Sequence, residues 1–265
     1  MAADKGAGEM TPRKIWDDVV SDACEKAREG APAGTKVRWH KGVTTRAWFG
    51  PRRTRPADAM YLAVLARPKV PMGFFDSLAT VGGLGAVEGL RSLGADARLA
   101  WPATVVDGSG RFLGSVRCRA GYGEGGVFIV ASAGVNVGEG EYSVPQDAPE
   151  PLEPVSVVDL VGPDDAPAAE DAVNVVCDAV AAAIDRWEQG IAAGQGAAGP
   201  LGPVLGDWFD EMPLMGQPVR VLLPDGREVA AGALVGIDGW GRVTVRTDDG
   251  SELEFSSGQV FLRPR

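Results

Sequence analysis

Three strand-like runs in the middle of the chain constrain its fold more than any other feature. They span 97–101, 112–119 and 127–137, and the last reads Val-Phe-Ile-Val-Ala-Ser-Ala-Gly-Val-Asn-Val. Short, strongly apolar runs bounded by glycines are typical of strands. The glycine-rich stretch 121–126 predicts a hairpin connection between the second and third runs. The centre of the molecule is therefore predicted to be a β-sheet.

Helical and strand patterns surround this central block. Thr11 and Pro12 form an N-cap and first-turn signal, and apolar residues at helical spacing follow as far as Gly30. Strands are predicted over 36–41 and 60–67, and helices over 74–93 and 167–188. The Gly82–Gly85 cluster lacks the Lys-Ser/Thr of a phosphate loop, so we interpret it as close helix–sheet packing. The proline- and acid-rich segment 141–164 is predicted to be mostly loop.

The tail of the chain has a different pattern. Short apolar runs over 218–223, 228–234, 242–246, 252–255 and 259–262 are separated by turn signals that contain Asp-Gly. Such spacing is typical of a small β-barrel. The predicted class is α+β, with disordered residues 1–12, a mixed, mostly antiparallel sheet with packed helices over 13–212, and a small barrel over 213–265.

Composition excludes several classes of protein. No run of about eighteen apolar residues is present, so no membrane-spanning helix is expected, and the first dozen residues lack the apolar segment of a signal peptide. Three widely spaced cysteines are typical of a reducing cytoplasm. His40 is the one histidine of the sequence, which argues against Ser-His-Asp catalysis and multi-histidine metal sites, and no metal ligand is predicted.

Charge is distributed unevenly along the chain. The net charge of −10 argues against nucleic acid as a partner, yet residues 36–69 carry nine Lys or Arg against one acid, Asp58. This basic stretch predicts an anion site, such as one for nucleotide phosphates. The alternative is a solvated surface strand and loop.

Particular motifs in the centre and the tail resemble those of biotin protein ligases. That family reads K-W-P-N-D, R-K-x-x-G-I-L and G-x-G-I-N, where this chain has A-W-P-A-T over 100–104, G-R-F-L-G-S-V over 110–116 and S-A-G-V-N over 132–136. The stretch GALVGIDGWGRVTVRTDDGSELEFSSGQVFLR is similar to the SH3-like C-terminal domain of the same family. The resemblance covers about residues 13–265, without the DNA-binding segment of repressor-type members.

The resemblance implies a two-step reaction. A carboxylic acid, biotin or a relative, attacks the α-phosphate of ATP in the presence of Mg²⁺, and a lysine of a biotinyl- or lipoyl-type carrier domain then attacks the acyl-adenylate. Bringing two anions together requires cations and backbone donors. The implied partners are the acid, ATP and the carrier, with no nucleic acid or membrane, for a monomer or homodimer.

Site residues follow from the same resemblance. The family's catalytic lysine aligns with Arg111, which keeps the charge but not the compact ammonium group. The residues implied to bind substrate or nucleotide are Lys41, Gly42, Arg46, Trp48, Trp101, Gly114, Asn136 and Arg263.

Other family positions are changed. Ala100, Ala103 and Thr104 replace the Lys, Asn and Asp of K-W-P-N-D. Val19, Val20 and Val37 fall where the family carries polar partners of the biotin ureido ring, and a buried polar group without a partner costs about 1–3 kcal/mol. Three hypotheses remain open: a divergent ligase for biotin or another acid, a pseudoenzyme that binds a nucleotide, acid or carrier without turnover, and a structural or interaction module.

Overall fold

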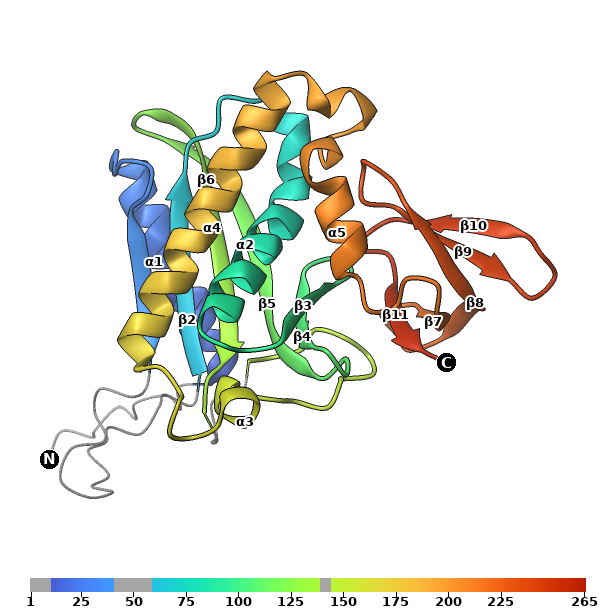
Figure 1. Cartoon of the computed structure of the whole chain (residues 1–265). Coiled ribbons are helices and arrows are strands. Elements are labelled where there is room, and N and C mark those ends of the chain that lie inside the picture. The colour runs from blue at the N-terminus through green and yellow to red at the C-terminus, as the bar shows by residue number, and fades with distance from the viewer. Residues whose placement is uncertain (1–10, 41–58, 139–143) are drawn as a thin grey trace, which may run out of the picture.

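A computed structural model of the 265-residue chain describes residues 11–40, 59–138 and 144–265. The larger part of the molecule is a six-stranded sheet flanked by helices, and a smaller five-stranded sheet follows (Figure 1). The larger part comprises α1 (Pro12–Arg28), β1 (Lys36–His40), β2 (Ala59–Ala66), η2 (Met72–Ser77), α2 (Leu78–Ser92), β3 (Ala97–Ala100), β4 (Thr104–Asp107), β5 (Phe112–Gly123), β6 (Gly126–Asn136), α3 (Val157–Val161) and α4 (Ala169–Ala192). The predicted α+β class is confirmed.

The six-stranded sheet has the order β1-β2-β6-β5-β4-β3, and each of these described strand pairs is antiparallel. Parallel pairing is limited, within the described ranges, to one isolated bridge between Phe112 and Pro154. Helices α2 and α4 cover one face and α1 covers the other (Figure 1). The alternating residues of β2 divide between the two cores: Met60 and Leu62 pack toward α2 and α4, whereas Tyr61 and Ala63 pack toward α1.

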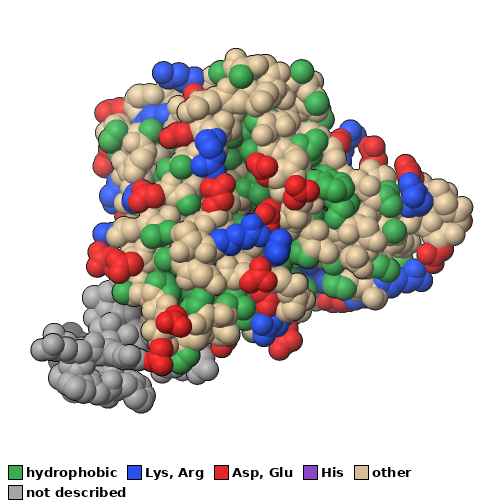
Figure 2. All heavy atoms as spheres, viewed as in Figure 1, with side chains coloured by type: hydrophobic (Ala, Val, Ile, Leu, Met, Phe, Trp, Pro, Cys, Tyr) green, Lys and Arg blue, Asp and Glu red, His purple; other side chains and the backbone are tan. Residues whose placement is uncertain are grey.

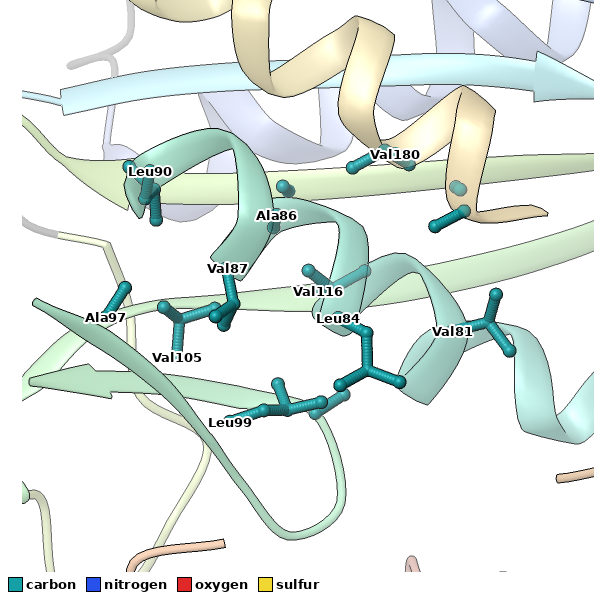
Figure 3. Close-up of a cluster of buried hydrophobic side chains, with 14 of the residues drawn as sticks. Val81, Leu84, Ala86, Val87, Leu90, Ala97, Leu99, Val105, Val116 and Val180 are labelled. Atoms are coloured by element: carbon teal, nitrogen blue, oxygen red, sulfur yellow. The ribbon is translucent and has the colours of Figure 1, made fainter. Parts of the chain in front are cut away.

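Glycines allow α2 to approach its neighbours closely. A Cβ atom on Gly85 would lie 2.7 Å from both the Ala179 carbonyl oxygen and the Val180 Cα of α4. A Cβ on Gly83 would lie 2.7 Å from Leu99 of β3, within the cluster drawn in Figure 3. The glycines therefore permit helix–helix packing in addition to the predicted helix–sheet packing.

Short helices lead from the larger sheet to the smaller one. They are η3 (Gln195–Ala198), η4 (Gly202–Val204) and α5 (Leu205–Glu211). The smaller sheet, here the C-terminal domain, has the order β10-β9-β8-β7-β11 and contains β7 (Pro218–Leu222), β8 (Glu228–Ile237), β9 (Val243–Thr247), β10 (Glu252–Phe255) and β11 (Phe261–Pro264). Each of its three Asp-Gly-containing turns has a glycine with positive φ: Gly226 and Gly250 follow the aspartate directly, whereas in the turn after Asp238 it is Gly241 and not Gly239.

Several element boundaries differ from the predictions. Thr11 caps α1 as expected, but α4 continues to Ala192 and residues 72–77 form a 3₁₀ turn before α2. Strand β4 follows the predicted run 97–101 and is not among the predicted strands, because its four residues carry too little periodicity. Strand β5 extends to Gly123, so the hairpin connection is shorter than 121–126.

Two short helices were also missed. α3 lies in the predicted loop 141–164, where Ser156 and Asp159 form a capping box, and α5 lies between the two sheets. No helix in the described part of the chain is both long and apolar enough to cross a membrane. Acidic and basic side chains are interspersed over the face in Figure 2.

Candidate functional site

A pocket of about 220 Å³ lies where the larger sheet meets the C-terminal domain. Its walls come from the β3–β4 turn, from β5, from residues 145–148 and 152, and from residues 213–214 and 261–264. Most lining side chains are apolar, among them Trp101, Phe112, Leu152, Leu214 and Phe261. Two arginines, Arg117 and Arg263, also line it. A small molecule with an apolar body and an anionic group is the chemistry that such a lining favours.

Trp101 joins the two parts of the molecule at this pocket. Its side chain is buried, and its indole Nε1 donates a hydrogen bond to the carbonyl oxygen of Gly241, at 2.9 Å. Gly241 belongs to the β8–β9 turn of the C-terminal domain. Trp101 therefore lines the pocket and also fixes the C-terminal domain against the sheet.

Residues 144–152, here called the strap, cross between the sheet and the C-terminal domain. The Glu150 carboxylate accepts hydrogen bonds from both terminal nitrogens of Arg220, at 3.2 and 2.6 Å, and its carbonyl oxygen accepts one from Nε of Arg263. Nη1 of Arg263 donates to the carbonyl oxygen of Leu262, and burial lowers the Arg263 pKa. Arg263 is thus placed at the pocket wall by backbone acceptors, with its charge close to the cavity.

The strap is held to the larger sheet through a second carboxylate. Asp147 accepts hydrogen bonds from Nη2 of Arg13 on α1 and Nη2 of Arg117 on β5. The Arg117 guanidinium carbon lies 4.0 Å from the centre of the Trp16 ring, a cation–π contact. Sequence reasoning did not select Arg117, Asp147 or Glu150, because their partners are remote along the chain.

Arg111, the predicted catalytic residue, has its guanidinium bound to another side chain. Its Nε and Nη2 donate to Oδ2 of Asp107 at 2.8 and 2.7 Å, and its backbone N–H donates to Oδ1. Burial alone would raise the Asp107 pKa, but hydrogen bonds from Arg111 and Ser109 hold it below its ordinary value. Although Gly110 and Phe112 line the pocket, Arg111 is not among its lining residues.

The same turn occurs in the C-terminal domain. Asp238-Gly-Trp-Gly-Arg242 repeats the pattern of Asp107-Gly-Ser-Gly-Arg111, with Oδ1 of Asp238 accepting from two backbone N–H groups and Oδ2 accepting from Nε of Arg242. In both turns the glycine before the arginine has positive φ. The repetition indicates a turn-stabilising role for Arg111, and its role in catalysis stays a prediction.

Two further predicted residues are engaged with backbone. Asn136 is buried, and its Oδ1 accepts from the backbone N–H of Val144 at 2.8 Å while its amide nitrogen donates to the Phe112 carbonyl oxygen. A Cβ on Gly114 would lie 2.3 Å from the carbonyl oxygen of Gly134 on β6. Neither residue lines the pocket.

The remaining predictions concern the basic stretch. Lys41, Gly42, Arg46 and Trp48 lie outside the described residues, so their predicted roles stay predictions. The described basic residues lie elsewhere: Lys36 and Arg38 pair with Asp178 and Glu170 of α4, and Arg67 donates to backbone carbonyl oxygens. These three described cations are thus each bound within the chain, and the anion site of the stretch stays a prediction.

The valines at the ureido positions are core residues. Val19 and Val37 are buried in the cluster beneath α1, together with Trp16 and Tyr61, and Val20 packs against it. A valine side chain has no hydrogen-bonding group, so these three residues supply only apolar surface.

Comparisons with known proteins identify the fold. Residues 214–263 match the biotin protein ligase C terminal domain family, and no curated protein matches the chain by sequence. The biotin protein ligase from Aquifex aeolicus in complex with biotin and ATP is 19% identical with a TM-score of 0.61, over 91% of this chain and 94% of that chain. A point variant of it in complex with biotin is 18% identical with a TM-score of 0.64, over 94% and 95% of the two chains.

A biotin protein ligase-like protein of unknown function from a Silicibacter species is similar over 100% of this chain and 94% of its own, at 19% identity and a TM-score of 0.59. These structures share the arrangement of the larger sheet and its helices followed by the smaller sheet. The present chain is thus a protein of the biotin protein ligase fold that carries the C-terminal domain of that family.

Proposed function

We propose that this protein is an ATP-dependent, acyl-adenylate-forming ligase that acts on a carboxylic acid with an apolar body. In the first step, an oxygen of the acid carboxylate bonds to the α-phosphorus of ATP and pyrophosphate leaves. In the second step, a lysine amine of a carrier domain bonds to the acyl carbon and AMP leaves. Biotin or a related acid is the substrate class of the ligase fold, whose solved members include complexes with biotin and ATP.

The observation that carries this proposal is the junction pocket. Its apolar walls suit an aliphatic chain, and Arg117 and Arg263 supply positive charge at its lining. The uncharged polar side chains that line it are Thr104, Ser115 and Gln146, and the amide of Gln146 is bonded to the backbone of Leu152 through both its oxygen and its nitrogen. The pocket therefore favours an aliphatic acid over biotin.

Mg²⁺ would enter this chemistry bound to ATP, whose phosphate charge it reduces. The described residues contain no group of three or more His, Cys, Asp or Glu that could hold a metal ion, and the pocket carboxylate Asp147 is paired with arginines. The chain's own contribution is to bind the acid in an apolar cavity, to orient it, and to offset its charge with arginines.

A second candidate function is binding without turnover. It is favoured by the ion pair between Arg111 and Asp107. A cation bound to a nearly buried carboxylate, whose side chain is 4% exposed, has little capacity to stabilise charge that develops on a phosphate. Under this alternative the same pocket binds a nucleotide, acid or carrier domain, and no pyrophosphate is released.

Arg263→Ala is expected to weaken ATP binding about tenfold, because it removes a partly buried charge at the pocket wall, worth about 1.4 kcal/mol. Isothermal titration of the full chain with ATP–Mg²⁺ measures this. Arg265→Ala is the matched control, since Arg265 lies two residues further along and pairs with the exposed carboxylate of Asp248. Equal losses in both variants, or no ATP binding by the unmodified protein, would contradict the proposed nucleotide site.

A further inference from the structure

Arg117 is the pocket arginine whose charge is neutralised by another side chain of the pocket. Arg117 and Asp147 both line the cavity, and their side chains are 32% and 47% exposed. The contact therefore borders the space that a ligand would occupy.

The surroundings of Arg117 explain why it keeps a counter-ion. Its guanidinium lies over the Trp16 ring, where burial lowers its pKa and the positive charge of Arg13 lowers it further. The negative charge of Asp17 raises the Arg117 pKa. The carboxylate that contacts the Arg117 guanidinium directly is that of Asp147, which also accepts a hydrogen bond from Arg13. Removing that carboxylate would leave Arg117 at the cavity wall, and Arg13 beside it, without this counter-ion.

The strap that carries Asp147 has anchors on both sides. Glu150 is bound by Arg220 of β7, and Val144 is bound by Asn136 at the end of β6. Asp147 lies between these points, so its side chain can leave Arg117 while the ends of the strap stay attached.

We propose that Asp147 is an internal counter-ion that occupies the anion position of the pocket, and that the anionic group of the ligand replaces it on Arg117. The ligand class is a carboxylate with an aliphatic chain, so this inference rests on the proposed function and deepens it. The neutral walls formed by Leu152, Leu214 and Phe261 take the chain, and Arg117, with Arg13 behind it, takes the carboxylate.

The test removes the internal counter-ion, the carboxylate of Asp147. Isothermal titration of the full chain compares octanoate with octanol, which has the same chain length and no charge. Asp147→Asn is expected to raise the affinity for octanoate about three- to tenfold and to leave octanol binding unchanged. Arg117→Gln is expected to lower octanoate binding at least threefold. Asp248→Asn, which removes an exposed carboxylate paired with Arg265, is the control and should behave as the unmodified protein, since neither residue lines the pocket.

The outcomes separate this proposal from the proposed function. Unchanged or weaker octanoate binding in Asp147→Asn overturns the counter-ion role, as does an equal gain for octanol, which would indicate a merely widened pocket. Absence of octanoate binding in every variant also overturns it. Pyrophosphate exchange is followed separately on the same samples, so a gain in octanoate affinity without exchange supports the counter-ion while contradicting the ligase reaction. Thermal unfolding of each variant verifies that it is folded.

Discussion

Gly85→Val is expected to destabilise the protein by about 3 kcal/mol or more. The added Cβ would lie 2.7 Å from backbone atoms of α4 and 2.9 Å from the Cβ of Ala183. Backbone atoms within a helix cannot give way individually, so α2 and α4 must separate and the core between them must loosen. Thermal unfolding should show a fall in Tm of roughly 6 °C or more.

Gly206→Val is the matched control for this prediction. Gly206 lies in α5, is exposed, and a Cβ placed on it meets no atom within 4 Å. The same substitution there should leave Tm nearly unchanged, because helix propensity does not penalise valine relative to glycine. A similar fall in Tm in both variants would show that close packing of α2 on α4 is not the cause.

Asp107→Ala is expected to lower the free energy of unfolding by about 2–3 kcal/mol, since several donors of the 107–111 turn then lose a nearly buried acceptor. Asp238→Ala removes the corresponding backbone and arginine bonds from the equivalent turn, which lacks the serine hydroxyl and where the carboxylate is 35% exposed, and should cost about 1 kcal/mol. Chemical denaturation of the unmodified protein and of the two variants measures these changes in the free energy of unfolding. Equal effects at the two turns would contradict the role of burial.

The Asp107 contribution should depend on pH in a defined direction. Its folded pKa is below the ordinary value of 3.8, so its stabilisation is present above about pH 4 and is lost as pH falls through the lowered pKa. The stability difference between the unmodified protein and Asp107→Ala should be constant from about pH 5 to 8 and should shrink below about pH 4. A difference that grows on acidification would contradict this sign.

Arg111→Ala distinguishes the structural role of this arginine from a catalytic one. If Arg111 serves the turn, its removal lowers stability together with any activity. If Arg111 is instead a catalytic cation, Arg111→Ala should lose pyrophosphate exchange while its free energy of unfolding stays unchanged. That result would support the role that the family resemblance implies.

The fold could be predicted from sequence because its signals are local. Asp-Gly turns at short intervals predict the small sheet, and Thr11-Pro12 predicts the start of α1, since each depends on neighbouring residues alone. Strand β4 escaped prediction because four residues carry too little periodicity. The family motifs predicted the larger fold because they preserve order and spacing over most of the chain.

The site could be predicted only in part, because its contacts join remote residues. Trp101 and Arg263 were selected through the resemblance, and both line the pocket. The pairs of Asp147 with Arg117 and Arg13 span 30 and 134 residues, and no local pattern links them. The resemblance selected Arg111 because it aligns with a lysine of the family. The Asp-Gly-x-Gly-Arg sequence at 107–111, which is repeated at 238–242, is the sequence signal that predicts a turn there.

The proposed reaction is tested most directly by pyrophosphate exchange with ATP–Mg²⁺ and a panel of biotin, lipoate and octanoate. The pocket predicts exchange that depends on an aliphatic acid, is weak or absent with biotin, and falls in Arg263→Ala but not in Arg265→Ala. Exchange with biotin at micromolar concentration would contradict the preference for an aliphatic acid. Absence of exchange with every acid, from protein that binds ATP, would contradict the ligase reaction itself and favour binding without turnover.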